Sequence, residues 1–149
     1  SGYKHFRYQL NEHPKAVDKV RRLNQMLKDK KNPLPAPNYA KEIKKQISAE
    51  GIQTINKELT KTKSAAEKIR LNEEKIYLID NSGWSRSQRF LAKNQTYNAL
   101  YGIYLQTGNN SKAAQAKEKC ARFFDAYQKT RQFSPEYHSR QSYEEWLYK

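Results

Sequence analysis

The sequence predicts an all-α fold, a bundle of five or six amphipathic helices that is either compact or elongated. Only two valines and five glycines occur, whereas Lys, Ala, Leu, Gln, Glu and Ile are abundant, a composition that favours helices over strands. Hydrophobic residues recur at spacings of three and four, and no alternating run lies between hairpin turns. With 149 residues the chain is most simply one domain, which we assign to residues 1–149.

The first two helices are predicted on either side of a proline-rich connector. Pro14 suits the first turn of a helix. Its apolar stripe consists of Ala16, Val20, Leu23 and Leu27. Residues 32–38 contain three prolines and predict a stiff, extended connector. Asn38 is the candidate N-cap of the second helix, and Gly51 is expected to break or bend that helix.

Serine residues mark the starts of later helices. Ser64 and Glu67 have the spacing of a capping box, and so do Ser85 and Gln88. Residues 80–83 give the strongest turn signal in the chain, so one helix is expected to end there. The side chains expected to point inwards from the third helix are Ile69, Ile76 and either Tyr77 or Ile79.

The last helices are predicted around a polar turn at residues 107–110. One helix is expected to start at Ser111, and a short terminal helix is expected after Ser134. Residues 97–127 resemble one helical hairpin of the tetratricopeptide type through Tyr97, Leu100, Tyr104, Gly108 and Ala113. The resemblance does not recur, and such repeats need about three units to be stable, so we interpret the segment as an ordinary helical hairpin.

The charge of the chain is its main functional signal. It has 29 Lys and Arg against 15 Asp and Glu, a formal net charge of +14, and both halves of the chain are basic. An excess of this size attracts polyanions. It predicts a phosphate-rich partner, which is an anionic membrane, a phosphoinositide head group or a nucleic acid.

The best candidate binding site lies at the turn before the helix that Ser85 begins. A helix start favours an anion, serine hydroxyls and arginines can hold phosphate, and tryptophan suits a membrane interface or a base stack. The candidate ligand-binding residues are Ser82, Trp84, Ser85, Arg86, Ser87 and Arg89. The alternative interpretation is that Ser85 only caps the helix while Trp84 packs on the core.

A second basic surface is expected around the proline-rich connector. If the first two helices pack antiparallel, six lysines gather at one end of the bundle, where they would attract lipid or nucleic-acid phosphates. They are Lys28, Lys30, Lys31, Lys41, Lys44 and Lys45. The alternative is that they form a solvated helix face.

Other residues give no catalytic or metal signature. The three histidines lack the spacing of metal ligands, Cys120 lies on an apolar stripe as a small hydrophobe would, and no carboxylate pair suits acid–base chemistry. The stripe of Tyr97, Tyr101 and Tyr104 is interpreted as core, with base stacking as the alternative. We therefore predict no enzyme activity, no cofactor and no metal.

The ends of the chain and its apolar runs bear on its location. Ser1 and Gly2 are typical of residues left by cloning, so the chain is expected to be a domain excised from a longer protein. No apolar signal region opens it, and its longest apolar stretch, residues 99–105, is too short to span a bilayer.

These observations favour a non-catalytic targeting module. The Lys-, Asn- and Gln-rich sequence with many short helices is similar to host-directed effector proteins of intracellular bacteria, some of which end in helical phosphoinositide-binding domains. This similarity favours lipid over nucleic acid. The first predicted partner is therefore an acidic lipid, first a phosphoinositide, at the cytosolic face of a membrane, with a peripheral location. The alternatives are a nucleic-acid-binding helical domain and an adaptor or secretion-signal domain for an acidic protein partner. The oligomeric state is not predicted.

Overall fold

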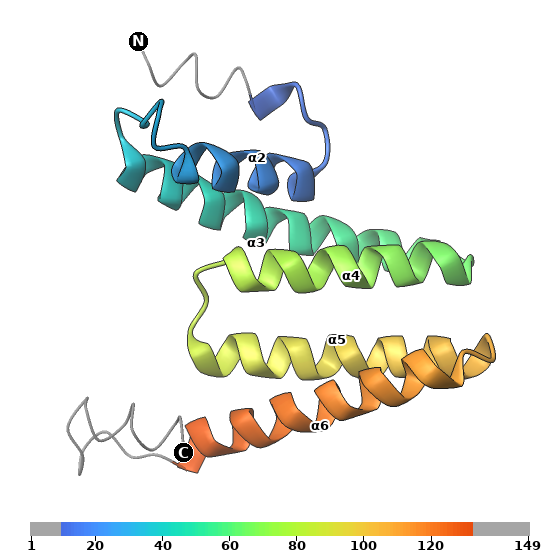
Figure 1. The fold of residues 1–149 in the computed structure, drawn as a ribbon. Helices are drawn as coiled ribbons and strands as arrows, with labels where there is room; N and C mark the ends of the chain where they lie inside the picture. Colours follow the sequence, from blue (N-terminus) through green and yellow to red (C-terminus); the bar gives the residue numbers. More distant parts are fainter. Residues whose placement is uncertain (1–9, 133–149) are drawn as a thin grey trace. The chain divides into compact units, whose positions relative to one another are not determined.

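The computed structural model describes residues 10–132 and confirms the predicted all-α class (Figure 1). The described part of the chain contains five long helices and no strand. They are α2 (Ala16–Lys28), α3 (Pro37–Lys61), α4 (Ala65–Asn81), α5 (Arg86–Gln106) and α6 (Asn110–Gln132). The helix predicted after Ser134 lies outside the described residues.

The chain divides into two compact units, residues 1–83 and 84–149. The division falls just after Gly83, within the turn that the sequence marks most strongly. Gly83 has a φ of +72°, a left-handed conformation that glycine adopts without strain and that ends α4. We describe each unit separately.

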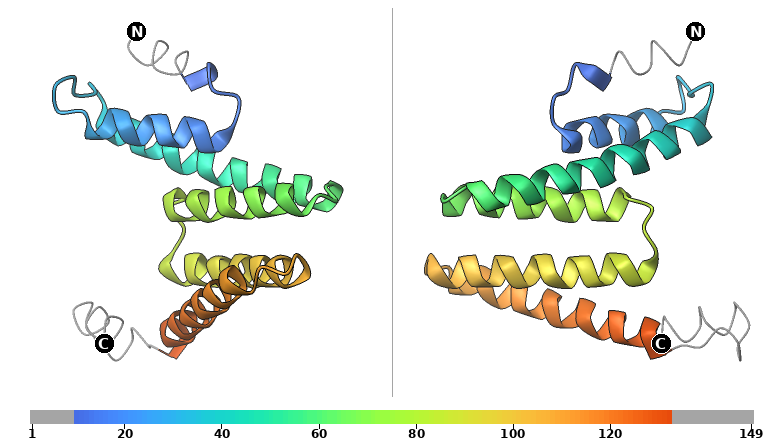
Figure 2. Two further views of the ribbon diagram at one scale, coloured as in Figure 1. Left: turned by 45° about the vertical axis from the view of Figure 1, so that its right-hand side comes forward. Right: turned by 180° about the vertical axis from the view of Figure 1, so that it is seen from behind.

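Within residues 10–83, unit 1 contains three long helices, and α2 packs on both α3 and α4. Figures 1 and 2 show that α2 and α3 are antiparallel, and that the C-terminal ends of α2 and α4 lie at the same end of the unit as the N-terminus of α3. One core cluster consists of Leu10, Leu23, Ala40 and Ile43. Leu34 packs against this cluster, so the proline-rich connector is held to the core.

The second helix differs from its prediction at both Asn38 and Gly51. Helix α3 begins at Pro37, whose fixed φ suits the first helical position, and Asn38 does not cap it because Ala36 occupies the N-cap. The helix also continues through Gly51 for 25 residues in all, so the predicted break there is wrong. A Cβ atom at position 51 would lie 2.5 Å from Ala16 Cβ and 2.8 Å from Leu78 Cδ1. Glycine therefore serves close packing of three helices at this position.

The buried face of α4 is only partly the one expected. Ile79 is fully buried as predicted, but Ile69, Ile76 and Tyr77 are half-buried. Leu71 and Leu78, two helical turns apart, form the fully buried stripe instead. Ser64 caps the helix by accepting a hydrogen bond from the Glu67 N–H.

Unit 2 contains the predicted helical hairpin, formed by α5 and α6. Gly108, with a φ of +75°, ends α5. The Gly108 N–H donates to the Leu105 carbonyl and the Asn109 N–H donates to the Tyr104 carbonyl, the pattern of a Schellman motif. Between the helices the rings of Tyr97 and Phe123 stack with centroids 5.7 Å apart.

Packing at Gly51 gives a prediction for stability. Gly51→Ala gains about 1 kcal/mol of helix propensity, but overpacking a tight contact costs about 1–3 kcal/mol. The first neighbour it meets is a Cβ atom, which cannot move without its backbone. The net of these two effects is a decrease of up to about 2 kcal/mol in the free energy of unfolding measured in urea. Gly102→Ala is the matched control, because no atom lies within 4 Å of the new methyl group and the substitution should stabilise α5. Equal stabilisation by both would contradict the packing role.

Candidate anion-binding surfaces

The N-terminus of α5 forms the capping box that its sequence predicts. The Ser85 hydroxyl accepts from the Gln88 N–H at 3.2 Å, and the Ser85 N–H donates to Gln88 Oε1 at 3.2 Å. Two backbone donors of the helix start are thereby hydrogen-bonded within the chain. Ser85 therefore caps α5, as the alternative interpretation of this segment predicts.

The other candidate residues around this turn belong to two units. Ser82 lies in unit 1, where it is buried and its hydroxyl donates to the Ile79 carbonyl at 2.7 Å. Trp84, Arg86, Ser87 and Arg89 lie in unit 2 and are half-buried. The Nε atom of Arg89 is buried without a hydrogen-bond partner in the described part of the chain. A phosphate site at this turn stays a prediction.

The six lysines of the second predicted surface all belong to unit 1. The antiparallel packing of α2 and α3 brings the end of α2, the connector and the first turns of α3 to one end of the unit (Figure 1). Asp29 shapes the connector, because its carboxylate accepts from the backbone N–H groups of Lys31 and Asn32. The lysines are exposed except Lys44, which is half-buried. We call this set, Lys28, Lys30, Lys31, Lys41, Lys44 and Lys45, the basic end.

The start of α3 adds to the positive character of the basic end. Its N-cap is Ala36, no side chain caps it, and its first turn carries no acidic residue. The positive pole of the α3 dipole therefore lies close to the lysines. The only ion pair at a basic-end lysine within residues 10–132 joins Lys45 to Glu42 at 3.2 Å, and both side chains are well exposed.

Lys44 is held by a polar network that the sequence analysis did not identify. Its Nζ donates to Asn24 Oδ1 at 3.2 Å. The Asn24 amide nitrogen donates to the Tyr77 hydroxyl at 2.9 Å and to Asn81 Oδ1 at 3.1 Å. One asparagine of α2 thus connects α3 with α4. Tyr77 and Asn81 are four residues apart, a spacing that places both on one face of α4 and was the available sequence signal.

The environment of Lys44 disfavours its charged form. Partial burial lowers the pKa of the Lys44 ammonium, and the positive charges of Lys41 and Lys45 lower it further. The three lysines lie within one turn of α3, so their charges add along one face. A bound anion would relieve this repulsion.

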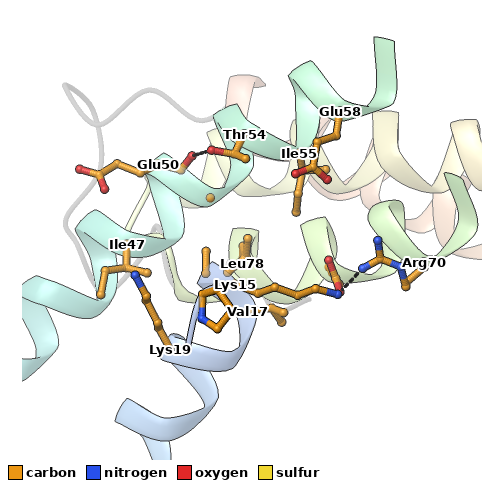
Figure 3. Close-up of a pocket in the computed structure, with 14 residues that line it drawn as sticks. Lys15, Val17, Lys19, Ile47, Glu50, Thr54, Ile55, Glu58, Arg70 and Leu78 are labelled. Carbon is orange, nitrogen blue, oxygen red and sulfur yellow. Dashed lines mark hydrogen bonds and ion pairs between the residues drawn. The ribbon is translucent and has the colours of Figure 1, made fainter. Parts of the chain in front are cut away.

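Unit 1 also contains a cavity of about 290 Å³ between α2, α3 and α4 (Figure 3). Apolar residues line part of it, including Ala16, Ile55 and Leu78. Its charged lining residues are three cations and three carboxylates, namely Lys15, Lys19, Arg70, Glu50, Glu58 and Glu74. The opposite charges balance, so the cavity does not extend the basic end.

Ion pairs concentrate on the α4 side of that cavity. Arg70 binds Glu67 with two nitrogens and also donates to Glu74 at 2.8 Å, while Lys15 approaches Glu74 to 3.8 Å. Hydrogen bonding to Arg70 lowers the pKa of the half-buried Glu67 carboxyl. This part of unit 1 is internally neutralised.

Cations in unit 2 lie over aromatic rings. Lys93 Nζ is 4.5 Å from the centroid of Phe123, and Lys119 Nζ is 5.4 Å from that of Tyr97. Lys112 and Lys117 lie over Tyr104 and Tyr101. Such contacts contribute about 0.5–1 kcal/mol at exposed sites. The Asn94 amide donates to the carbonyl and the Sγ of Cys120, which is half-buried.

The described residues contain no group of three or more side chains that could hold a metal ion, and none of their helices is long and apolar enough to cross a membrane. Comparisons with protein families, with curated proteins and with solved structures find no match for this chain.

The capping box at Ser85 gives a prediction for stability. Ser85→Ala removes the acceptor of the Gln88 N–H, and loss of such a cap costs about 1 kcal/mol. Ser87→Ala, two residues further along, is the control, because the capping box is formed by Ser85 and Gln88 and does not include the Ser87 hydroxyl. Urea unfolding followed by circular dichroism should show a lower free energy of unfolding for Ser85→Ala than for Ser87→Ala. Equal stability of both would show that the cap does not stabilise α5.

Proposed function

We propose that the chain is a non-catalytic binding module for an anionic, phosphate-bearing ligand, first an acidic lipid such as a phosphoinositide at the cytosolic face of a membrane. One observation carries the proposal: six lysines and an uncapped helix start gather at the basic end of unit 1. Just one ion pair neutralises any of these lysines within the described residues, and it is exposed.

Clustering matters more than net charge for such binding. The Debye length is about 8 Å at physiological ionic strength, so charges further apart act almost independently on a surface. Each basic residue close to an anionic bilayer contributes about 1 kcal/mol. Cations gathered at one end of a helical unit reach the surface together, whereas cations spread over all faces cannot.

The aromatic residues favour lipid over nucleic acid as the ligand. Binding of single strands depends on open aromatic faces on which bases stack. Tyr97, Tyr101 and Tyr104 instead have lysine ammonium groups over their rings. Those rings are therefore less suited to stacking on bases.

Trp84, Arg86 and Arg89 remain the proposed second contact. Trp84 would enter the membrane interface while the arginines hold a head group. Under this proposal Trp84→Ala weakens vesicle binding more than it weakens binding of a soluble head group. Such a combination of weak signals is common among peripheral membrane proteins.

The basic end makes a quantitative prediction. The triple variant Lys28→Gln, Lys30→Gln, Lys31→Gln removes three lysines that would face the bilayer, so the affinity for phosphatidylserine vesicles should fall by about 100-fold. The control triple variant carries Lys57→Gln, Lys61→Gln and Lys63→Gln. These lysines are also exposed but lie towards the other end of α3, with Lys57 about 24 Å along the helix from Lys41. Co-sedimentation at near-physiological salt measures the vesicle affinity of both triple variants.

Other outcomes would replace the proposal. Equal losses in the two triple variants would indicate attraction by net charge alone. Tight nucleic-acid binding in a gel shift, beside weak and salt-sensitive lipid binding, would favour the nucleic-acid alternative. Failure of both assays would favour an acidic protein partner.

A further inference from the structure

Asn24 organises hydrogen-bond donors at one place in the basic end. Its amide oxygen accepts from Lys44 Nζ, and its amide nitrogen donates to both the Tyr77 hydroxyl and Asn81 Oδ1. All the hydrogen-bonding capacity of the Asn24 amide nitrogen is thus used within unit 1. The positions of Lys44 and Tyr77 are fixed relative to each other by this one side chain.

Lys44 and Tyr77 retain further hydrogen-bond donors beyond their bonds to Asn24. An ammonium group has three N–H donors, and the bond to Asn24 uses one of them. The Tyr77 hydroxyl accepts from Asn24, so its own proton is available to donate. No acceptor for the Tyr77 proton is found among the described residues. Lys44 and Tyr77 therefore offer donors on two sides of the same asparagine.

Further cations surround these donors. The guanidinium of Arg21 lies 5.3 Å from the centroid of the Tyr77 ring, and its ion pair with Asp18, at 3.5 Å, is exposed. Lys41 and Lys45 flank Lys44 closely enough for their charges to lower its pKa. The stem of Lys45 passes over Gly83, so it is directed towards the end of α4. Other cations therefore lie near both Lys44 and Tyr77, the two groups that Asn24 holds.

We infer that Lys44, the Tyr77 hydroxyl and Arg21 form a binding site for a phosphate monoester, with Asn24 as the positioning residue. The inference rests on the proposed function and names the chemical group that the basic end recognises. A monoester carries about −1.5 to −2 charges and three acceptor oxygens, whereas the phosphodiester of an ordinary anionic lipid carries one charge and two free oxygens. Fixed donors distinguish these groups, but a diffuse charge does not.

The experiment compares two kinds of vesicle with equal surface charge. One contains phosphatidylcholine with phosphatidic acid, whose head group is a monoester, and the other contains phosphatidylcholine with phosphatidylserine, a diester. The measured quantity is the ratio of the two affinities. We expect wild-type protein to prefer the monoester by about tenfold, the effect of one charge-assisted hydrogen bond.

Two uncharged substitutions test the site without changing the net charge. Asn24→Ala removes the acceptor that positions Lys44, and Tyr77→Phe removes the hydroxyl but keeps the ring under Arg21. Each should bring the ratio close to one. The controls are Asn56→Ala, an exposed asparagine of α3, and Tyr101→Phe in α5, which should keep the wild-type ratio. Circular dichroism verifies that all variants fold. If Asn24→Ala does not fold, Tyr77→Phe alone provides the test.

Soluble glycerol 3-phosphate separates the site from the membrane function. If it raises the melting temperature of wild-type protein but not of Tyr77→Phe, the site exists, and failure of vesicle binding would then overturn only the proposed lipid partner. Displacement of the protein from phosphatidic acid vesicles by glycerol 3-phosphate would indicate that free phosphate esters are also ligands. Equal wild-type affinity for both vesicles, or a preference that survives both substitutions, would overturn the inference and leave the proposed function standing.

Discussion

The arrangement of unit 1 depends on the close approach of three helices at Gly51. The space that a side chain would take at this position is occupied by Ala16 and Leu78, so α3 touches α2 and α4 at the same level. A glycine inside a helix costs about 1 kcal/mol, whereas each fully buried aliphatic side chain contributes about 1.5–3 kcal/mol. Burial of Val20, Leu71 and Leu78 outweighs that cost. The same packing sets the ends of α2 and α4 beside the start of α3. Because these ends are close, Asn24 of α2 can form hydrogen bonds to both α3 and α4.

The fold separates the charges of a strongly basic unit into two kinds of surface. Along α4, carboxylates and cations are interspersed, and Arg70 is bonded to Glu67 and Glu74. At the basic end Lys44 is bonded to an amide, and the one ion pair found at these lysines within residues 10–132 joins Lys45 to Glu42. Exposed ion pairs contribute little to stability, about 0–1 kcal/mol each, so stability alone does not require either arrangement. An end of a helical unit that keeps its positive charge repels itself, and a polyanionic ligand removes that repulsion.

Local signals predicted the helices well, and contacts between helices were beyond them. The capping box of Ser85 and the hairpin of α5 and α6 follow from short spacings, and the structure contains both. The expected break at Gly51 was wrong because a propensity describes the isolated helix and not the space between helices. The sequence did not identify Leu71 and Leu78 as the buried stripe of α4, because apolar residues form more than one possible stripe on that helix. The lysines of the basic end were identified because they cluster in the sequence around the connector. Asn24 and Tyr77 were not identified, since they and Lys44 lie on three separate helices that meet only in the fold.

The two anion sites expected from the sequence differ in how many donors are already in use. At the start of α5 a phosphate would compete with Ser85 and Gln88, whose side chains bond two backbone N–H groups. Displacing such a cap costs about 1 kcal/mol before any bond to the ligand forms. At Lys44 the bond to Asn24 uses one of the three ammonium protons, so a phosphate at the proposed site would not have to displace it. The site that a helix-start pattern predicts most directly is therefore the one whose donors serve the fold. Among the lysines of the basic end, the side-chain hydrogen bonds found within the described residues are those of Lys44 to Asn24 and Lys45 to Glu42.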